Sequence, residues 1–158
     1  MSSARRVATS GSLPRHERRT RSAPSPGRPT DYDAVRELWK QHSQAEERRD
    51  LPGLLATLTE DCVYEIVGTE HVWHGHEGAS RFYAGLLGAF PDIDFQLTDI
   101  VIGPQGVCEA ADVTGTHEQD WLDYEASGES VEFRVVIFFP WDPEQRLFGG
   151  ERVHVSLE

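Results

Sequence analysis

Hydrophobic residues recur at helical spacing in three early segments of the chain and alternate with polar residues in its second half. The first segment starts near Asp31, a suitable helix cap, and its periodic stripe comprises Val35, Leu38, Trp39, His42 and Ala45. The second follows Asp50, and its stripe comprises Leu51, Leu54, Leu55 and Leu58. The third starts after Gly75 and stops at Pro91, and its stripe comprises Phe82, Leu86 and Phe90. These patterns predict three amphipathic helices.

The remaining segments have the pattern of β-strands. A short run at 62–67 is rich in β-branched and aromatic residues, and 70–74 can pair with it. Turn-forming residues separate four longer runs, which are 93–102, 107–118, 130–141 and 147–157. Helices followed by an antiparallel meander predict an α+β fold, in which the helices pack on one face of a curved antiparallel sheet.

Residues 1–30 differ from the rest in composition, because they are rich in Arg, Ser, Pro and Gly and lack apolar periodicity. This composition predicts a disordered basic tail, which leaves residues 31–158 as a single domain. An Arg- and Ser-rich start is also typical of a transit peptide, and the letters ARR of a twin-arginine signal. No apolar segment follows, however, and this argues against export.

The net charge of the chain is −12, and the body is more acidic still, because the tail holds seven arginines and one glutamate. We therefore expect no binding to nucleic acid or to anionic membranes. No apolar run approaches the ~20 residues that a membrane span needs. The two cysteines, Cys62 and Cys108, are too few for a disulfide framework, so we expect a reducing, cytoplasmic location.

The stretch HVWHGHE, residues 71–77, holds three of the seven histidines. A zinc site needs three or four ligands in fixed geometry. His74 and His76 flank a glycine at a strand-to-helix junction, where their directions diverge, and no cysteine or second histidine cluster stands nearby. We therefore expect no bound metal.

Strand alternation selects two residues that could carry chemistry. His117 shares its face of one strand with Val113, and Glu151 shares its face of the last strand with Val153 and Val155. If the valine faces point inward, a carboxylate and an imidazole lie in an apolar pocket and could move a proton. The alternative is structural: His117 stabilises the loop that follows it, and Glu151 pairs with an arginine such as Arg134.

The order helix, helix, strand, helix, strands carries the segments WHGHEGASRFY, FPDIDFQLTDIV, VTGTHEQDWL and FGGERV. Together these resemble the SnoaL-like polyketide cyclase family of the nuclear transport factor 2-like superfamily, over about residues 33–155. The resemblance implies a cone-shaped fold with a pocket between sheet and helices. It also implies a homodimer formed through the sheet, and chemistry without a metal or an organic cofactor.

An apolar pocket with few polar groups suits a small hydrophobic, oxygenated molecule such as a polyketide, terpenoid or steroid-like compound. The first hypothesis is a cofactor-independent cyclase or isomerase with Glu151 and His117 as its acid–base pair. The residues expected to contact substrate are Tyr64, His74, Trp39, Phe82 and Phe133.

The second hypothesis is a non-catalytic ligand-binding or dimerising module of the same fold. Similar sequences usually carry an aromatic residue and an aspartate after the segment GER, whereas this chain has His154 and Ser156 there. This departure favours the second hypothesis.

Overall fold

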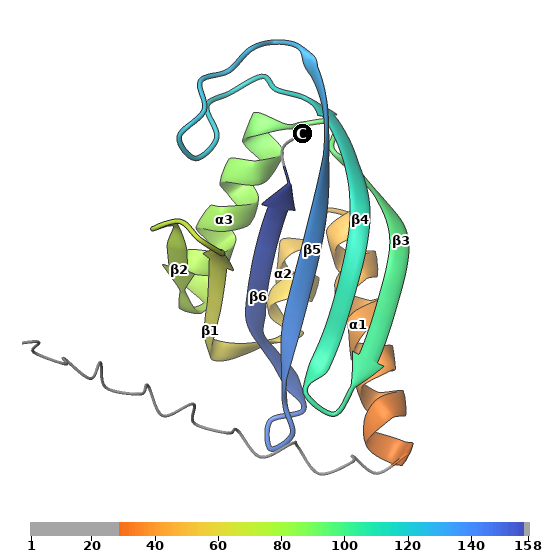
Figure 1. Cartoon of the computed structure of the whole chain (residues 1–158). Helices are drawn as coiled ribbons and strands as arrows, with labels where there is room; N and C mark the ends of the chain where they lie inside the picture. The colour runs from red at the N-terminus through yellow and green to blue at the C-terminus, as the bar shows by residue number, and fades with distance from the viewer. Residues whose placement is uncertain (1–28, 157–158) are drawn as a thin grey trace, which may run out of the picture.

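Residues 29–156, which a computed structural model of the chain describes, form three helices and six strands (Figure 1). The helices are α1 (Pro29–Glu47), α2 (Leu51–Leu55) and α3 (Gly75–Ala89). The strands are β1 (Leu58–Ile66), β2 (Val72–His74), β3 (Asp94–Gly103), β4 (Gly106–Thr116), β5 (Ser130–Asp142) and β6 (Leu147–Ser156). The predicted disordered tail, residues 1–30, lies outside the described residues except for the two that begin α1.

The six strands form one sheet in the order β2-β1-β6-β5-β4-β3. Neighbouring strands are antiparallel at every position except one, because β1 and β6 run parallel. The expectation of a wholly antiparallel sheet is therefore corrected at that pair. After β1 the chain crosses through α3 and the meander β3 to β6, so the last strand returns beside the first in the same direction.

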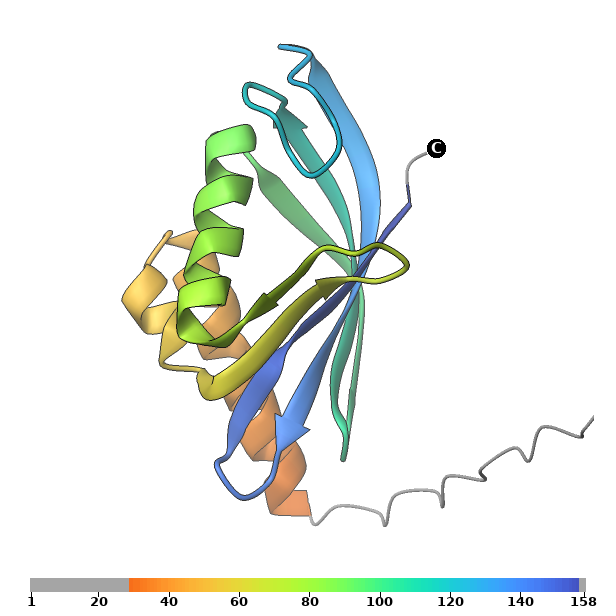
Figure 2. The same ribbon diagram turned by 90° about the vertical axis from the view of Figure 1, so that its left-hand side faces the viewer.

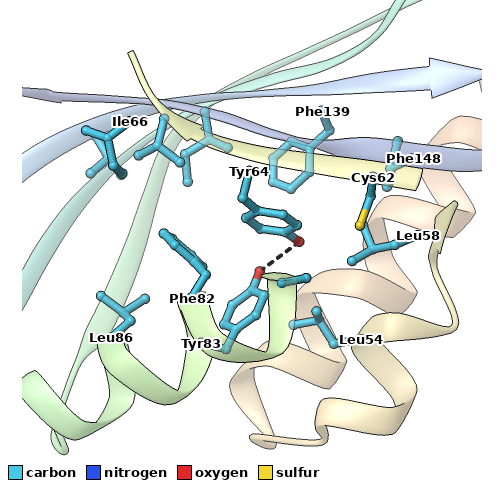
Figure 3. Packing of buried hydrophobic residues seen from close by; sticks show 14 of the residues in the cluster. Leu54, Leu58, Cys62, Tyr64, Ile66, Phe82, Tyr83, Leu86, Phe139 and Phe148 are labelled. Atoms are coloured by element: carbon cyan, nitrogen blue, oxygen red, sulfur yellow. Dashed lines mark hydrogen bonds between the residues drawn. The ribbon is translucent and has the colours of Figure 1, made fainter. Parts of the chain in front are cut away.

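The helices all lie on one side of the sheet (Figure 2), which confirms the predicted α+β class. The sheet curves around α3 and α1, and the core fills the space between them. Side chains from β1, β6, β5 and α3 meet there, and the largest that are fully buried include Tyr64, Phe139 and Phe148 (Figure 3). Burial of one large apolar side chain stabilises the fold by about 1.5–3 kcal/mol.

The second helix is shorter than its leucine stripe predicts. The Asp50 side chain caps it by accepting a hydrogen bond from the Gly53 amide at 3.1 Å, and the helix ends at Leu55. Leu58 instead begins β1, where it is buried opposite Phe148. The predicted leucine stripe therefore combines three residues of α2 with the first residue of β1, because both elements bury apolar side chains against the same core.

The parallel contact between β1 and β6 depends on a glycine. Gly150 has φ of +111°, a conformation that disfavours side chains, and a Cβ there would collide with the backbone of Val63. The close approach sets the position of the next residue, Glu151, on the inner face of the sheet. None of the described helices is long and apolar enough to cross a membrane.

Candidate functional site

A cavity of about 530 Å³ lies between α3, the loop 117–129, the turn after β1 and the inner face of the sheet. This volume is within the range of small-molecule sites. Its apolar wall includes Ile66, Phe82, Leu86, Phe90, Ile93, Phe95, Trp121, Val131, Phe133, Val135, Ile137 and Val153. Its polar wall consists of Glu46, Thr69, His71, His117, Asp123, Glu125, Ser127 and Glu151, with the Tyr124 ring at the loop.

Glu151 is buried, at 3% exposure, as alternation along β6 predicts. Its Oε1 atom lies 3.0 Å from Nε2 of His42 and accepts a hydrogen bond from the Tyr83 hydroxyl at 2.7 Å. Arg134, which sequence suggested as a partner, instead faces Asp99 and Asp112 on the other side of the sheet. The carboxyl group is therefore held by an imidazole from α1 and a phenol from α3.

Thr57 determines which nitrogen of His42 carries a proton. The Thr57 hydroxyl donates to the Leu54 carbonyl at 2.6 Å, and the same oxygen lies 2.6 Å from Nδ1 of His42. A hydroxyl has one proton to donate, so Nδ1 must be the donor to Thr57. In a neutral His42 the other nitrogen, Nε2, would then carry no proton.

The Nε2 to Oε1 hydrogen bond therefore needs a second proton, either on His42 or on Glu151. Both arrangements hold one proton between the two atoms, so the pair as a whole is either an ion pair or two neutral groups. Glu151 needs a partner such as His42 because it is almost completely buried, and an isolated buried carboxylate is strongly disfavoured. The His42–Glu151 pair is thus a buried proton-holding unit.

Two tyrosines extend this network. Tyr83 donates to Glu151, and its hydroxyl lies 3.3 Å from that of Tyr64, which is fully buried (Figure 3). Burial, followed by the nearby charge of Glu151, raises the pKa of both phenols well above their usual value, so they remain protonated donors. Among His42, Thr57, Tyr64, Tyr83 and Glu151, only Glu151 lines the cavity.

Two further carboxyl groups lie on the inner side of the fold. Burial, with the charges of Glu151 and Glu109, raises the pKa of Glu46 well above its usual value. Burial raises the pKa of Glu109 to about 7, although a hydrogen bond from Trp39 Nε1 at 2.7 Å opposes this shift. Glu46 lines the cavity, whereas Glu109 and Trp39 do not.

His117 is buried, at 7% exposure, and lines the same cavity. Its ring stacks on Phe90 with centroids 5.0 Å apart. Its backbone fastens the following loop through hydrogen bonds with Glu129 and Gly128. The ring atom Nε2 nevertheless has no hydrogen-bond partner among the described residues.

His117 and Glu151 do not contact each other. The register along β5 shows how far apart they are. His117 hydrogen-bonds to Glu129, just before β5 begins, whereas Glu151 precedes Arg152, which lies opposite Phe138 near the other end of β5. Roughly nine residues of β5 separate these levels, and a strand rises about 3.3 Å per residue. The two side chains lie at opposite ends of the cavity, far beyond hydrogen-bonding distance. Both side chains line the same cavity without contacting each other, and the imidazole that contacts Glu151 is that of His42.

The expected substrate contacts divide into two groups. Phe82 and Phe133 line the cavity. Trp39, Tyr64 and His74 do not: Trp39 donates to Glu109, and Tyr64 is core with its hydroxyl on Tyr83. His74 is the last residue of β2 and is exposed, as is Val72 two residues earlier, so strand alternation puts it on the opposite face from Trp73.

The three histidines of residues 71–77 do not form one site. His71 lines the cavity and hydrogen-bonds to Asp123 at 2.9 Å, and Nε2 of His76 bonds to the Leu58 carbonyl at 3.1 Å. Within residues 29–156, no three His, Cys, Asp or Glu side chains come together as a metal site would require. His154 and Ser156, the unusual residues of the last strand, are exposed on the opposite face from Glu151 and do not line the cavity.

Sequence reasoning missed His42, Tyr83 and Glu46 as parts of the site. The signal was present on α1, where His42 occupies a core-facing position and Glu46 follows four residues later on the same face. An ionisable residue within an apolar helical stripe needs a buried partner, and that partner is Glu151.

The family model described as SnoaL-like domain matches residues 35–145, and the chain belongs to this family. No curated protein has significant sequence similarity to the chain.

Solved structures share the fold at low sequence identity. A putative SnoaL-like polyketide cyclase from Jannaschia has a TM-score of 0.66 and 18% identity over 85% of this chain and 91% of its own. AclR, a putative hydroxylase from Streptomyces galilaeus, has a TM-score of 0.63 and 19% identity, covering 79% and 90%. A protein of unknown function from Burkholderia pseudomallei, described as NTF2-like, has a TM-score of 0.64 and 16% identity, covering 78% and 91%. These likenesses establish the nuclear transport factor 2-like fold.

Proposed function

We propose that this SnoaL-like protein binds a small hydrophobic, oxygenated molecule in its cavity and moves a proton on a carbon next to a carbonyl group, as in a cyclisation or an isomerisation. One observation carries the proposal: the buried network ends at Glu151, its single member on the cavity wall. The names of the structural neighbours, polyketide cyclase and hydroxylase, are compatible with such ligands. The proposed reaction uses no cofactor or metal.

Glu151 is the base in this mechanism. Both hydrogen bonds that hold the carboxyl group end on Oε1, so Oε2 is the atom we assign to the ligand. Oε2 takes a proton from the carbon, and the electron pair of the broken C–H bond moves to the carbonyl oxygen as an enolate. The enolate then takes the proton back from Oε2 at another carbon, or its carbon attacks a second carbonyl group, whose oxygen becomes an alkoxide and takes the proton from Oε2. Glu151 is a base in the ion-pair form of the buried unit, in which His42 carries a proton on each ring nitrogen and donates from Nε2 to Oε1 at 3.0 Å. The abstracted proton therefore stays on Oε2 until it returns to the ligand.

The rest of the cavity positions the ligand. Phe82 and Phe133 supply apolar contact from α3 and β5, and His117 has a free ring nitrogen at the opposite end. A ligand oxygen that reached this nitrogen would satisfy an otherwise unpaired buried group, which favours an oxygenated molecule over a hydrocarbon.

The test uses 2-tetralone, a small aromatic ketone, in deuterated buffer. Wild type should accelerate exchange of the protons next to the carbonyl, measured by NMR, and Glu151→Gln should reduce this acceleration by roughly 10²–10⁴. Asp123→Asn is the matched control, because this carboxylate also lines the cavity but is exposed. Unchanged exchange in the Gln variant refutes the assignment of Glu151. If tetralone raises the melting temperature without any exchange, the protein is the non-catalytic binding module of the second hypothesis.

A homodimer through the outer face of the sheet is part of the proposal. Val101 is 68% exposed there and Val136 38%, and both lie near half-buried Phe138. Ion pairs of Arg134 and Arg152 flank these apolar residues. An apolar centre with a charged rim is typical of interfaces. Val101→Glu should convert a dimer to a monomer in light scattering, and an unaltered mass would exclude this face.

A further inference from the structure

The wall of the cavity carries four acidic residues and two histidines, and no lysine or arginine of the described residues lines it. Its acidic residues are Glu46, Asp123, Glu125 and Glu151. Burying an anionic ligand beside carboxylates and without a cation is strongly unfavourable. The cavity is therefore suited to uncharged ligands.

Glu46 differs from Glu151 in its partners. It lies one helical turn after His42 on α1 and lines the cavity beside the network. No described residue hydrogen-bonds to its carboxyl group, whereas Glu151 has both His42 and Tyr83. The carboxyl groups that face it are Glu151 from β6 and Glu109 from β4, and both act as negative neighbours. The phenols of Tyr64 from β1 and Tyr83 from α3 also interact with its charge.

These surroundings favour the protonated form of Glu46. Burial is the largest cause, and the charges of Glu151 and Glu109 act in the same direction to raise the pKa of Glu46. A protonated carboxyl group is a hydrogen-bond donor, and its proton has no protein acceptor in the described residues. The donor is available to whatever occupies the cavity.

We propose that Glu46 is held as a neutral carboxylic acid and donates a hydrogen bond to a carbonyl oxygen of an uncharged ligand. The inference rests on the proposed function and assigns the ligand class, an uncharged ketone, aldehyde or ester. In the proton transfer, Glu46 would stabilise the oxygen that becomes negative while Glu151 removes the proton. One carboxyl group thus acts as a hydrogen-bonding acid and the other as a base, because their environments differ.

A second observation indicates that the same cavity receives a ligand. Nε2 of His117 is a buried polar atom without a partner on the cavity wall, and such atoms are rare in folded proteins. It lies at the opposite end from Glu46, so a ligand can make polar contacts at either end of an apolar chamber.

The experiment compares three probes of similar shape by calorimetry. They are 2-acetylnaphthalene, 2-ethylnaphthalene, which lacks the oxygen, and 2-naphthoate, which is anionic. Wild type should bind the ketone about tenfold more tightly than the hydrocarbon, as one hydrogen bond allows. It should bind the naphthoate most weakly. The preference for the ketone should fall as pH rises and Glu46 loses its proton.

Two variants and a control separate the outcomes. Glu46→Leu should lose the tenfold preference but still bind the hydrocarbon. Glu46→Gln, whose amide donates without ionising, should keep the preference and lose its pH dependence. Glu109→Gln removes a carboxyl group away from the cavity wall, and it should leave the preference unchanged at the acidic end of the pH range, where Glu46 keeps its proton in both proteins.

Equal binding of ketone and hydrocarbon by wild type would overturn the role of Glu46 while leaving the binding cavity intact. Tighter binding of naphthoate than of the ketone would overturn it as well. If none of the three probes binds, the proposed function itself fails, and the role of Glu46 fails with it.

Discussion

The two ends of the cavity are built differently. At the inner end, Glu151 is held by His42 and Tyr83, and every link comes from a helix or a strand. At the outer end, His117 has an unpaired ring nitrogen beneath the loop 117–129, whose Tyr124 is 54% exposed. The inner end satisfies its polar groups within the protein, and the outer end leaves one for a ligand.

This difference assigns separate tasks to the two ends. A side chain whose hydrogen bonds are fixed by regular elements keeps its geometry when a ligand arrives, which suits proton transfer. A loop that covers an unpaired group can adapt to ligands of different outline. The inner end is therefore suited to chemistry and the outer end to recognition.

The largest effect should come from breaking the inner pair. His42→Leu leaves Glu151 buried without its nitrogen partner, and we expect a loss of about 3–5 kcal/mol in the free energy of unfolding, measured by urea denaturation. The double variant His42→Leu with Glu151→Leu should recover most of that loss. A single variant as stable as wild type would show that the pair is not buried as described.

Gly150→Ala tests how the inner end is positioned. The positive φ and the collision with Val63 should cost about 2–4 kcal/mol, because the backbone has to move where β6 passes β1. Gly68→Ala is the control, since Gly68 also has positive φ but no atom lies within 4 Å of its added Cβ. Equal losses for the two variants would mean that backbone conformation alone matters.

Glu109 should make stability depend on pH. Its pKa is about 7 in the folded chain and close to 4.5 when unfolded, so the folded state keeps a proton that the unfolded state has lost between these values. Its stabilising contribution is complete below about pH 4.5 and disappears as pH rises to about 7. Because the residue is only partly buried and solvent screens part of the effect, we expect roughly 1–2 kcal/mol. Glu109→Gln should flatten this part of the curve, and an unchanged curve would contradict the shift.

The smallest effect on stability should come from the outer end. His117→Leu removes a buried nitrogen that has no partner, so the free energy of unfolding should change by less than about 1 kcal/mol. The same variant should weaken the binding of a diketone with an oxygen at each end, measured by calorimetry, and leave the binding of 2-acetylnaphthalene unchanged. A loss as large as that of His42→Leu would show that the two ends are equally structural and would remove the basis of the comparison.

Much of the fold was predictable from local patterns. The helical stripes before and after β1 located α1 and α3, and Pro91 and the turn residues separated the later strands. Alternation along β4 and β6 correctly placed His117 and Glu151 on the inner face. The positions of these elements and the faces of these residues follow from hydrophobic periodicity and composition, which are properties of a single helix or strand.

The partners in the site were decided by the tertiary structure. Periodicity shows that His42 and Glu151 face inward, but they are 109 residues apart in the chain. Their contact depends on the parallel pairing of β1 with β6 and on the placement of α1 across the sheet. Register likewise set His117 at the opposite end from Glu151, because alternation fixes the face of a residue and leaves its level along the strand open. Which inward-facing groups meet is determined only when the elements pack.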